Sequence, residues 1–156
     1  MNENEVISME GPGSPPIEGQ KSSRNRILVV DDDSDVRQRN VTLLIDSGYD
    51  VEDATNGADG WEALQDRYFD LVITDNRMPK MTGVEMIEKL RLSRMTIPVI
   101  MATSHMPTFE FARKPWLRPD LAMVVPFSDD EFLAAIRNLL RKGDDVRPES
   151  LLPNNP

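Results

Sequence analysis

The chain has 156 residues, of which 27 are acidic and 18 basic, and its formal net charge is −9. It contains no cysteine, which excludes a disulfide framework, a thiolate zinc site and a cysteine nucleophile. The excess of acid also argues against nonspecific binding of nucleic acid or of anionic membranes by the chain as a whole, because both need a cationic surface.

The composition predicts one folded block between two unstructured ends. Residues 1–25 are rich in glycine, proline and serine, so we expect a disordered leader there. This leader has neither the basic start nor the apolar run of a signal peptide, and no apolar run in the chain is long enough to span a bilayer. We therefore expect a cytoplasmic protein without membrane insertion. Residues 143–156 have a similar composition and are expected to form a disordered tail, which leaves residues 26–142 as the domain.

Inside this block, short apolar runs alternate with segments of helical period. In chain order, we predict strands at residues 27–30, 49–54, 69–74, 97–102 and 121–125, with helices at 34–45, 58–67 and 83–92 and a last helix from 128. The last helix is the best signalled, because Ser128 and Glu131 form a capping box at its start. This alternation predicts an α/β fold, a doubly wound sheet of parallel strands with helices on both faces.

Acidic and hydroxyl side chains follow three of the predicted strands. The first strand is followed by Asp31, Asp32 and Asp33, the third by Asp75, and the fourth ends near Thr103. Because such sheets bind ligands at the carboxyl ends of their strands, we expect these groups to converge. Carboxylates gathered at one edge would repel one another without a cation, and an all-oxygen set favours Mg²⁺. For Asp33 we favour a different role, as the cap of the helix that follows it.

Four motifs carry a resemblance to a known family. They are ILVVDDD at residues 27–33, DLVITDNRMPKMTG at 70–83, IPVIMATS at 97–104 and VVPF at 124–127. In this order and spacing they resemble the receiver domain of bacterial two-component response regulators, over nearly all of residues 26–142. The resemblance implies a flavodoxin-like sheet of five parallel strands, and a regulatory phosphoacceptor rather than an enzyme.

The resemblance also implies roles for individual residues. Asp75 would accept a phosphoryl group from a histidine kinase or a phosphotransfer protein, and Thr103 would hydrogen-bond that group. Asp31, Asp32 and Asp75, together with the backbone carbonyl of Arg77, would hold Mg²⁺. Such transfer works by positioning and by neutralising charge on the attacking carboxylate and the phosphoryl oxygens. Output would then pass to a downstream protein by direct contact.

Two coupling elements of the family are missing. Its receivers have a lysine immediately before the proline that follows the fifth strand, whereas here Val125 precedes Pro126. The loss of one charge-assisted contact costs about 1.5–3 kcal/mol. As a hypothesis, Arg77 or Lys80 partly replaces this lysine. The aromatic residue that many receivers carry on the fifth strand is Ala122 here.

The segment where the family has its fourth helix is also unusual. It contains three prolines, Pro107, Pro115 and Pro119, and three aromatic residues, Phe109, Phe111 and Trp116. We expect a helix there to stop within about two turns, because proline disrupts helix interiors. The aromatic residues are either core or loop anchors, which we favour, or a patch that binds a partner.

Three functions stay open. The first is a response regulator phosphorylated on Asp75. The second is a degenerate receiver that binds proteins without productive phosphorylation, an interpretation favoured by Val125 and Ala122. The third, a Mg²⁺-dependent phosphohydrolase using Asp31 and Asp33, is supported only at the first strand. We expect no direct binding of nucleic acid, because no DNA-binding domain follows residue 142 in this sequence.

Overall fold

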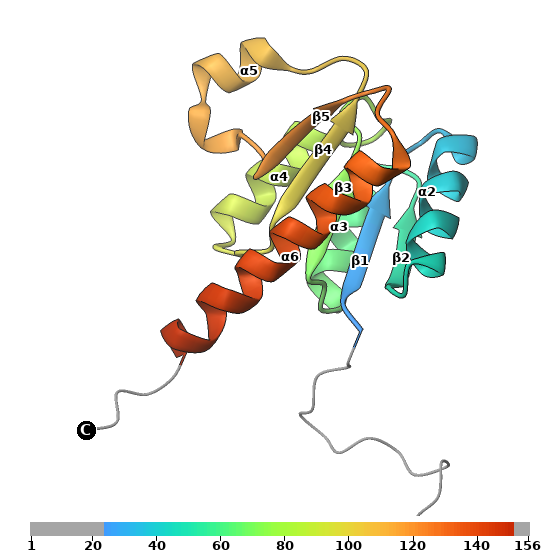
Figure 1. The fold of residues 1–156 in the computed structure, drawn as a ribbon. Helices are drawn as coiled ribbons and strands as arrows, with labels where there is room; N and C mark the ends of the chain where they lie inside the picture. Colours follow the sequence, from blue (N-terminus) through green and yellow to red (C-terminus); the bar gives the residue numbers. More distant parts are fainter. Residues whose placement is uncertain (1–23, 152–156) are drawn as a thin grey trace, which may run out of the picture.

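The centre of the molecule is a sheet of five parallel strands (Figure 1). The computed structural model describes residues 24–151, with side chains as far as Gly143. The strands are β1 Arg26–Val30, β2 Asp50–Ala54, β3 Leu71–Thr74, β4 Val99–Thr103 and β5 Leu121–Val124. Their spatial order is β2-β1-β3-β4-β5. From β1 the chain adds β2 on one side and then β3, β4 and β5 on the other, so the order of the strands reverses between β1 and β3. In doubly wound sheets, ligands bind at this switch point.

Six helical segments surround the sheet. They are α2 Ser34–Asp46, α3 Gly57–Asp66, α4 Gly83–Leu92, α5 Thr108–Arg113, the short 3-10 helix η1 Pro115–Leu117, and α6 Asp129–Leu151. The predicted strands and helices agree with these bounds to within two residues at each end that was predicted. The α/β fold class with a five-stranded parallel sheet is confirmed.

Two apolar layers hold the helices against the two faces of the sheet. Because successive strand residues point to opposite faces, Ile27 and Val29 of β1 pack with α2 and α6, whereas Leu28 and Val30 pack with α3 and α4. The first layer is closed by Leu44, Phe132, Ile136 and Leu140, and the second by Leu64, Met86, Ile87 and Leu90, all of them buried. Figure 1 shows the same arrangement, with α2 and α6 in front of the sheet and α3 and α4 behind it.

The segment between β4 and β5 departs from this regular pattern. Helix α5 ends at Arg113, two residues before Pro115, as the prolines predict. Phe111 is buried, but Phe109 is 72% exposed and Trp116 is 47% exposed. The interpretation of these aromatic residues as core or loop anchors is confirmed for Phe111, which lies in the core, and stays a prediction for Phe109 and Trp116.

The end of α6 differs from the predicted tail. We expected disorder from Gly143, but the helix continues to Leu151. Gly143 lies inside this helix and does not take the positive φ with which a glycine commonly ends one. The predicted leader up to residue 23 and the last five residues, 152–156, lie outside the described residues. Within the described part of the chain, no helix is both long and apolar enough to cross a bilayer.

Candidate functional site

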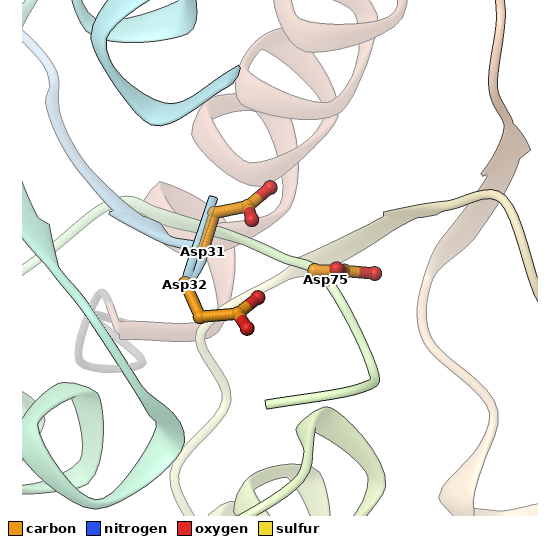
Figure 2. Close-up of side chains that lie close together, drawn as sticks. All are labelled: Asp31, Asp32 and Asp75. Carbon is orange, nitrogen blue, oxygen red and sulfur yellow. The ribbon is translucent and has the colours of Figure 1, made fainter. Parts of the chain in front are cut away.

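Three carboxylates meet at the switch point between β1 and β3 (Figure 2). Asp31 and Asp32 follow β1 and Asp75 follows β3, and one carboxylate oxygen from each lies within 4.8 Å of the others. The sheet register explains this arrangement. Val30 is paired with Thr74, and the residue that follows each of them is an aspartate, Asp31 or Asp75. The structure thus brings together the acids that the sequence singled out.

Burial and neighbouring carboxylates make the ionised form of Asp31 unfavourable unless a cation is nearby. Burial raises its pKa from 3.8 to about 6, and the negative charges of Asp75, Asp32 and Asp33 act in the same direction. The backbone N–H of Asp33 donates a hydrogen bond to Oδ1 of Asp31 (2.9 Å), which lowers the pKa but does not offset the burial. A cluster of carboxylate oxygens in this condition fits a hard divalent cation such as Mg²⁺.

The turn after β1 is fixed by two side chains. Asp33 caps α2, since its Oδ1 accepts hydrogen bonds from the N–H groups of Asp35 (2.9 Å) and Val36 (3.1 Å). The capping role that we favoured for Asp33 is therefore confirmed. Arg37, which sequence reasoning missed, donates from Nη1 to the carbonyl oxygen of Asp31 (2.8 Å) and from Nε to Asp53 (2.9 Å). It ties the end of β1 to β2, and thereby positions the acid pair.

The loop after β3 packs closely behind Asp75. The backbone N–H of Asn76 donates to Oδ1 of Asp75 (2.7 Å), and the buried Asn76 side chain accepts from the N–H of Val84 at the start of α4 (3.0 Å). Gly83 lies so close that a Cβ there would be 2.3 Å from the Asp75 carbonyl oxygen. Neither Asn76 nor this contact was singled out from the sequence. Gly83 ends the motif DLVITDNRMPKMTG at residues 70–83, and this glycine was the available signal for the close approach.

Arg77 lies in the same loop, two residues after Asp75. Its side chain is exposed, and in the described part of the chain no group donates a hydrogen bond to its carbonyl oxygen. The role of this carbonyl as a fourth protein ligand, which the family resemblance implies, stays a prediction.

Thr103 ends β4 beside the acids. It is 2% exposed, and its Oγ1 accepts a hydrogen bond from the N–H of His105 (3.2 Å). Thr103, Asp31 and Asp75 line one cavity of about 240 Å³. The His105 ring is exposed, contacts Ser104 Oγ (2.9 Å) and is not part of the cavity wall.

The lining of this cavity also includes the departure from the family pattern. Val125 and Pro126, joined by a cis peptide bond, line the cavity where the family has its lysine. Arg77 and Lys80, the two cations considered as replacements, are exposed and do not line it. Arg39 and Asn40 of α2 do line it, although the sequence did not single them out.

Comparison with known proteins agrees with this geometry. The family model of the response regulator receiver domain matches residues 27–137. The transcriptional regulatory protein DltR of Streptococcus agalactiae is 32% identical over 130 residues, which cover 83% of this chain and 58% of DltR. The alkaline phosphatase synthesis transcriptional regulatory protein PhoP of Bacillus subtilis is also 32% identical, over 83% of this chain and 54% of PhoP. The chain thus spans little more than half the length of these relatives.

Solved structures give the same result. A CheY-like response regulator receiver domain protein from Methanospirillum hungatei superposes with a TM-score of 0.74 at 27% identity, covering 79% of this chain and 98% of that protein. The response regulator TrrA of Thermotoga maritima, solved in complex with Mg²⁺ and BeF, has a TM-score of 0.65 at 28% identity, over 74% of this chain and 98% of TrrA. The chain belongs to the family of response regulator receiver domains.

Proposed function

We propose that this chain is a two-component response regulator that accepts a phosphoryl group on Asp75 from a histidine kinase or a phosphotransfer protein. The observation that supports this most directly is the meeting of the Asp75, Asp31 and Asp32 carboxylates within 4.8 Å at the edge of a cavity. A phosphoacceptor needs such a place, because a cation must balance the charge of the attacking carboxylate and of the phosphoryl oxygens.

The residues of the site suit this reaction. Asp31, Asp32, Asp75 and the backbone carbonyl of Arg77 would hold Mg²⁺, which supplies positive charge when bound. An oxygen of Asp75 attacks phosphorus as the bond from phosphorus to the donor breaks, and an acyl phosphate forms. The Asn76 N–H holds Oδ1 of Asp75 (2.7 Å), which leaves the second carboxylate oxygen for the attack.

Thr103 would report that the phosphoryl group has arrived. Its hydroxyl lines the cavity and contacts the backbone of His105. A phosphoryl oxygen on Asp75 would be a stronger acceptor for this hydroxyl than a neutral carbonyl, because charge-assisted hydrogen bonds are the stronger class. We propose that the signal then passes to a downstream protein by contact, and that the domain is a regulatory phosphoacceptor rather than a classical enzyme.

A degenerate receiver is the second candidate, and specific observations favour it. Val125 replaces the lysine in the cavity wall, and Ala122 on the exposed side of β5 cannot act as a switch aromatic. On this alternative the fold is kept as an interaction module, and Asp75 is not productively phosphorylated. The phosphohydrolase alternative loses support, because Asp33 caps α2.

The deciding experiment is phosphorylation by a small-molecule donor such as acetyl phosphate, with and without Mg²⁺, followed by intact mass. We expect one phosphoryl group on the wild-type protein and none on Asp75→Asn. Omission of Mg²⁺ should also prevent the reaction. A wild-type protein that is not modified, and that does not bind beryllium fluoride with Mg²⁺, would contradict the proposal and support the interaction module.

A further inference from the structure

The cavity beside Asp75 has a cation in its wall, although not at the position where the family has one. Of the residues that line it, Arg39 is the one that carries a full positive charge. It comes from α2, together with Val36 and Asn40, and lines the same cavity as Asp75 and Val125. The cavity therefore has an apolar residue, Val125, directly after β5 where the lysine would be, and a guanidinium that comes from α2.

Arg39 has a partner that it can leave. Its Nη2 lies 2.9 Å from Oδ1 of Asp129 at the start of α6. The Arg39 side chain is 67% exposed and that of Asp129 is 53% exposed. Exposed ion pairs of this kind contribute little to stability, so exchange of Asp129 for a more highly charged anion is favourable. Asp129 is also not needed for the cap of α6, which Ser128 and Glu131 form between them.

We propose that Arg39 binds the phosphoryl group on Asp75 and takes the role of the missing lysine, an inference that rests on the proposed function. Phosphorylation converts the single negative charge of Asp75 into a dianionic group with three acceptor oxygens. A guanidinium matches two such oxygens at once and stays charged at all relevant pH values. Arg39 then leaves Asp129, so this ion pair between α2 and α6 breaks when the site is phosphorylated.

The test compares Arg39→Leu, Arg39→Lys and wild type, with Arg141→Leu as the matched control. Arg141 lies on α6, does not line the cavity, and its replacement removes the same charge. The readouts are affinity for beryllium fluoride with Mg²⁺ and the rate of phosphorylation by acetyl phosphate. We expect Arg39→Leu to lower both by about tenfold, the loss of one charge-assisted contact. Arg39→Lys should keep most of each, and Arg141→Leu should match wild type.

A second measurement follows the exchange itself. In wild type, the Nε–H resonance of Arg39 should shift when beryllium fluoride and Mg²⁺ are added, and it should not shift in Asp75→Asn. Asp129→Asn should raise beryllium fluoride affinity by about twofold to threefold, because Arg39 no longer has a competing anion. These readouts do not depend on a variant's overall stability, which circular dichroism would check separately.

The outcomes separate this inference from the function on which it rests. If wild type is phosphorylated on Asp75 and Arg39→Leu behaves like wild type, the role of Arg39 is overturned while the proposed function stands. A loss seen with Arg77→Ala or Lys80→Ala, but not with Arg39→Leu, overturns it in favour of those cations. If wild type neither reacts nor binds beryllium fluoride, both proposals fall.

Discussion

Two groups of residues that line the cavity differ in how closely they follow the receiver pattern: those after β1 and β3, and those after β5. On the β1 and β3 side, Asp31 and Asp75 are held by backbone hydrogen bonds within a buried frame, and both are the acids that the family resemblance implies. On the β5 side, Val125 is 42% exposed and the strand before it alternates between half-buried and exposed residues. The comparison indicates that the acids are fixed by a buried frame, whereas the residue that departs from the family pattern lies in a more exposed part of the cavity lining.

The largest expected effect comes from a substitution in the loop behind Asp75. In Gly83→Ala the new Cβ would lie 2.3 Å from the Asp75 carbonyl oxygen, so the backbone of the loop must move. We expect a loss of about 2–4 kcal/mol in unfolding free energy, as for other overpacked sites, together with loss of phosphorylation on Asp75. Urea denaturation and intact mass measure the two effects.

Gly143→Ala is the matched control for that variant. A Cβ at Gly143 meets no atom within 4 Å, so alanine should be neutral or stabilise the helix by up to about 1 kcal/mol. Equal stabilities for the two variants would show that the loop behind Asp75 is not tightly packed.

The next effect comes from restoring a lysine at the position of Val125. Val125→Lys places an ammonium group where the family has one, at a position that lines the cavity. We expect affinity for beryllium fluoride with Mg²⁺ to rise by about tenfold, corresponding to about 1.4 kcal/mol from one charge-assisted contact. No gain in affinity would mean that the side chain at position 125 does not reach the bound group. The absence of a lysine there would then not distinguish this site from that of other receivers.

An effect of similar size concerns the support of the acid pair at the end of β1. Arg37→Ala removes the hydrogen bonds to the Asp31 carbonyl oxygen (2.8 Å) and to the Asp53 carboxylate (2.9 Å). We expect a loss of about 1–2 kcal/mol in stability, with weaker Mg²⁺ binding by calorimetry, because the turn after β1 is less well held. Arg37→Lys should restore part of the stability, since lysine reaches one of the two acceptors. Unchanged Mg²⁺ affinity in Arg37→Ala would contradict the positioning role.

A further effect is a dependence on pH. The folded protein holds a proton on Asp31 more tightly than the unfolded chain does, because its pKa is raised from 3.8 to about 6. In metal-free protein, the stability that comes from Asp31 is therefore complete below pH 3.8 and is lost as the pH rises through about 6. Mg²⁺ binding should strengthen over the same interval, because it requires the carboxylate.

Thermal unfolding of wild type and Asp31→Asn, each with and without Mg²⁺, measures this dependence. The difference between the two metal-free proteins should change with pH in the stated direction, and the gain in wild-type Tm on adding Mg²⁺ should grow as the pH rises. A difference that is flat across this range would show that Asp31 has an ordinary pKa.

The sheet and the acids could be predicted because both depend on local pattern. A buried parallel strand is a short apolar run, and the residue that follows it lies at the carboxyl edge, so Asp31 and Asp75 could be placed before any coordinates. Arg37 could not, because its partner Asp53 lies on β2 and their contact depends on how α2 packs. Arg39 was missed for the same reason, since its place in the cavity follows from the position of α2 beside the Val125 segment.

The exposed aromatic residues show the limit of composition. Phe109 and Phe111 are two positions apart in a helix, so they lie on different sides of it and only one can face the core. The sequence does not say which one, because α5 is too short for its period to define a face. The continuation of α6 beyond Gly143 was missed because a glycine marks the end of a helix only when its φ is positive.

The position of β5 has a consequence for how this domain behaves at high concentration. It is the last strand of the sheet, so one of its edges has no neighbouring strand among residues 24–151. An open edge of this kind can pair with the same edge of another molecule and start aggregation. Here the strand is only four residues long and is bracketed by Pro119 and Pro126, which have no N–H to donate. A second molecule could therefore form only a few backbone hydrogen bonds with this edge, which protects the domain from aggregation by strand pairing.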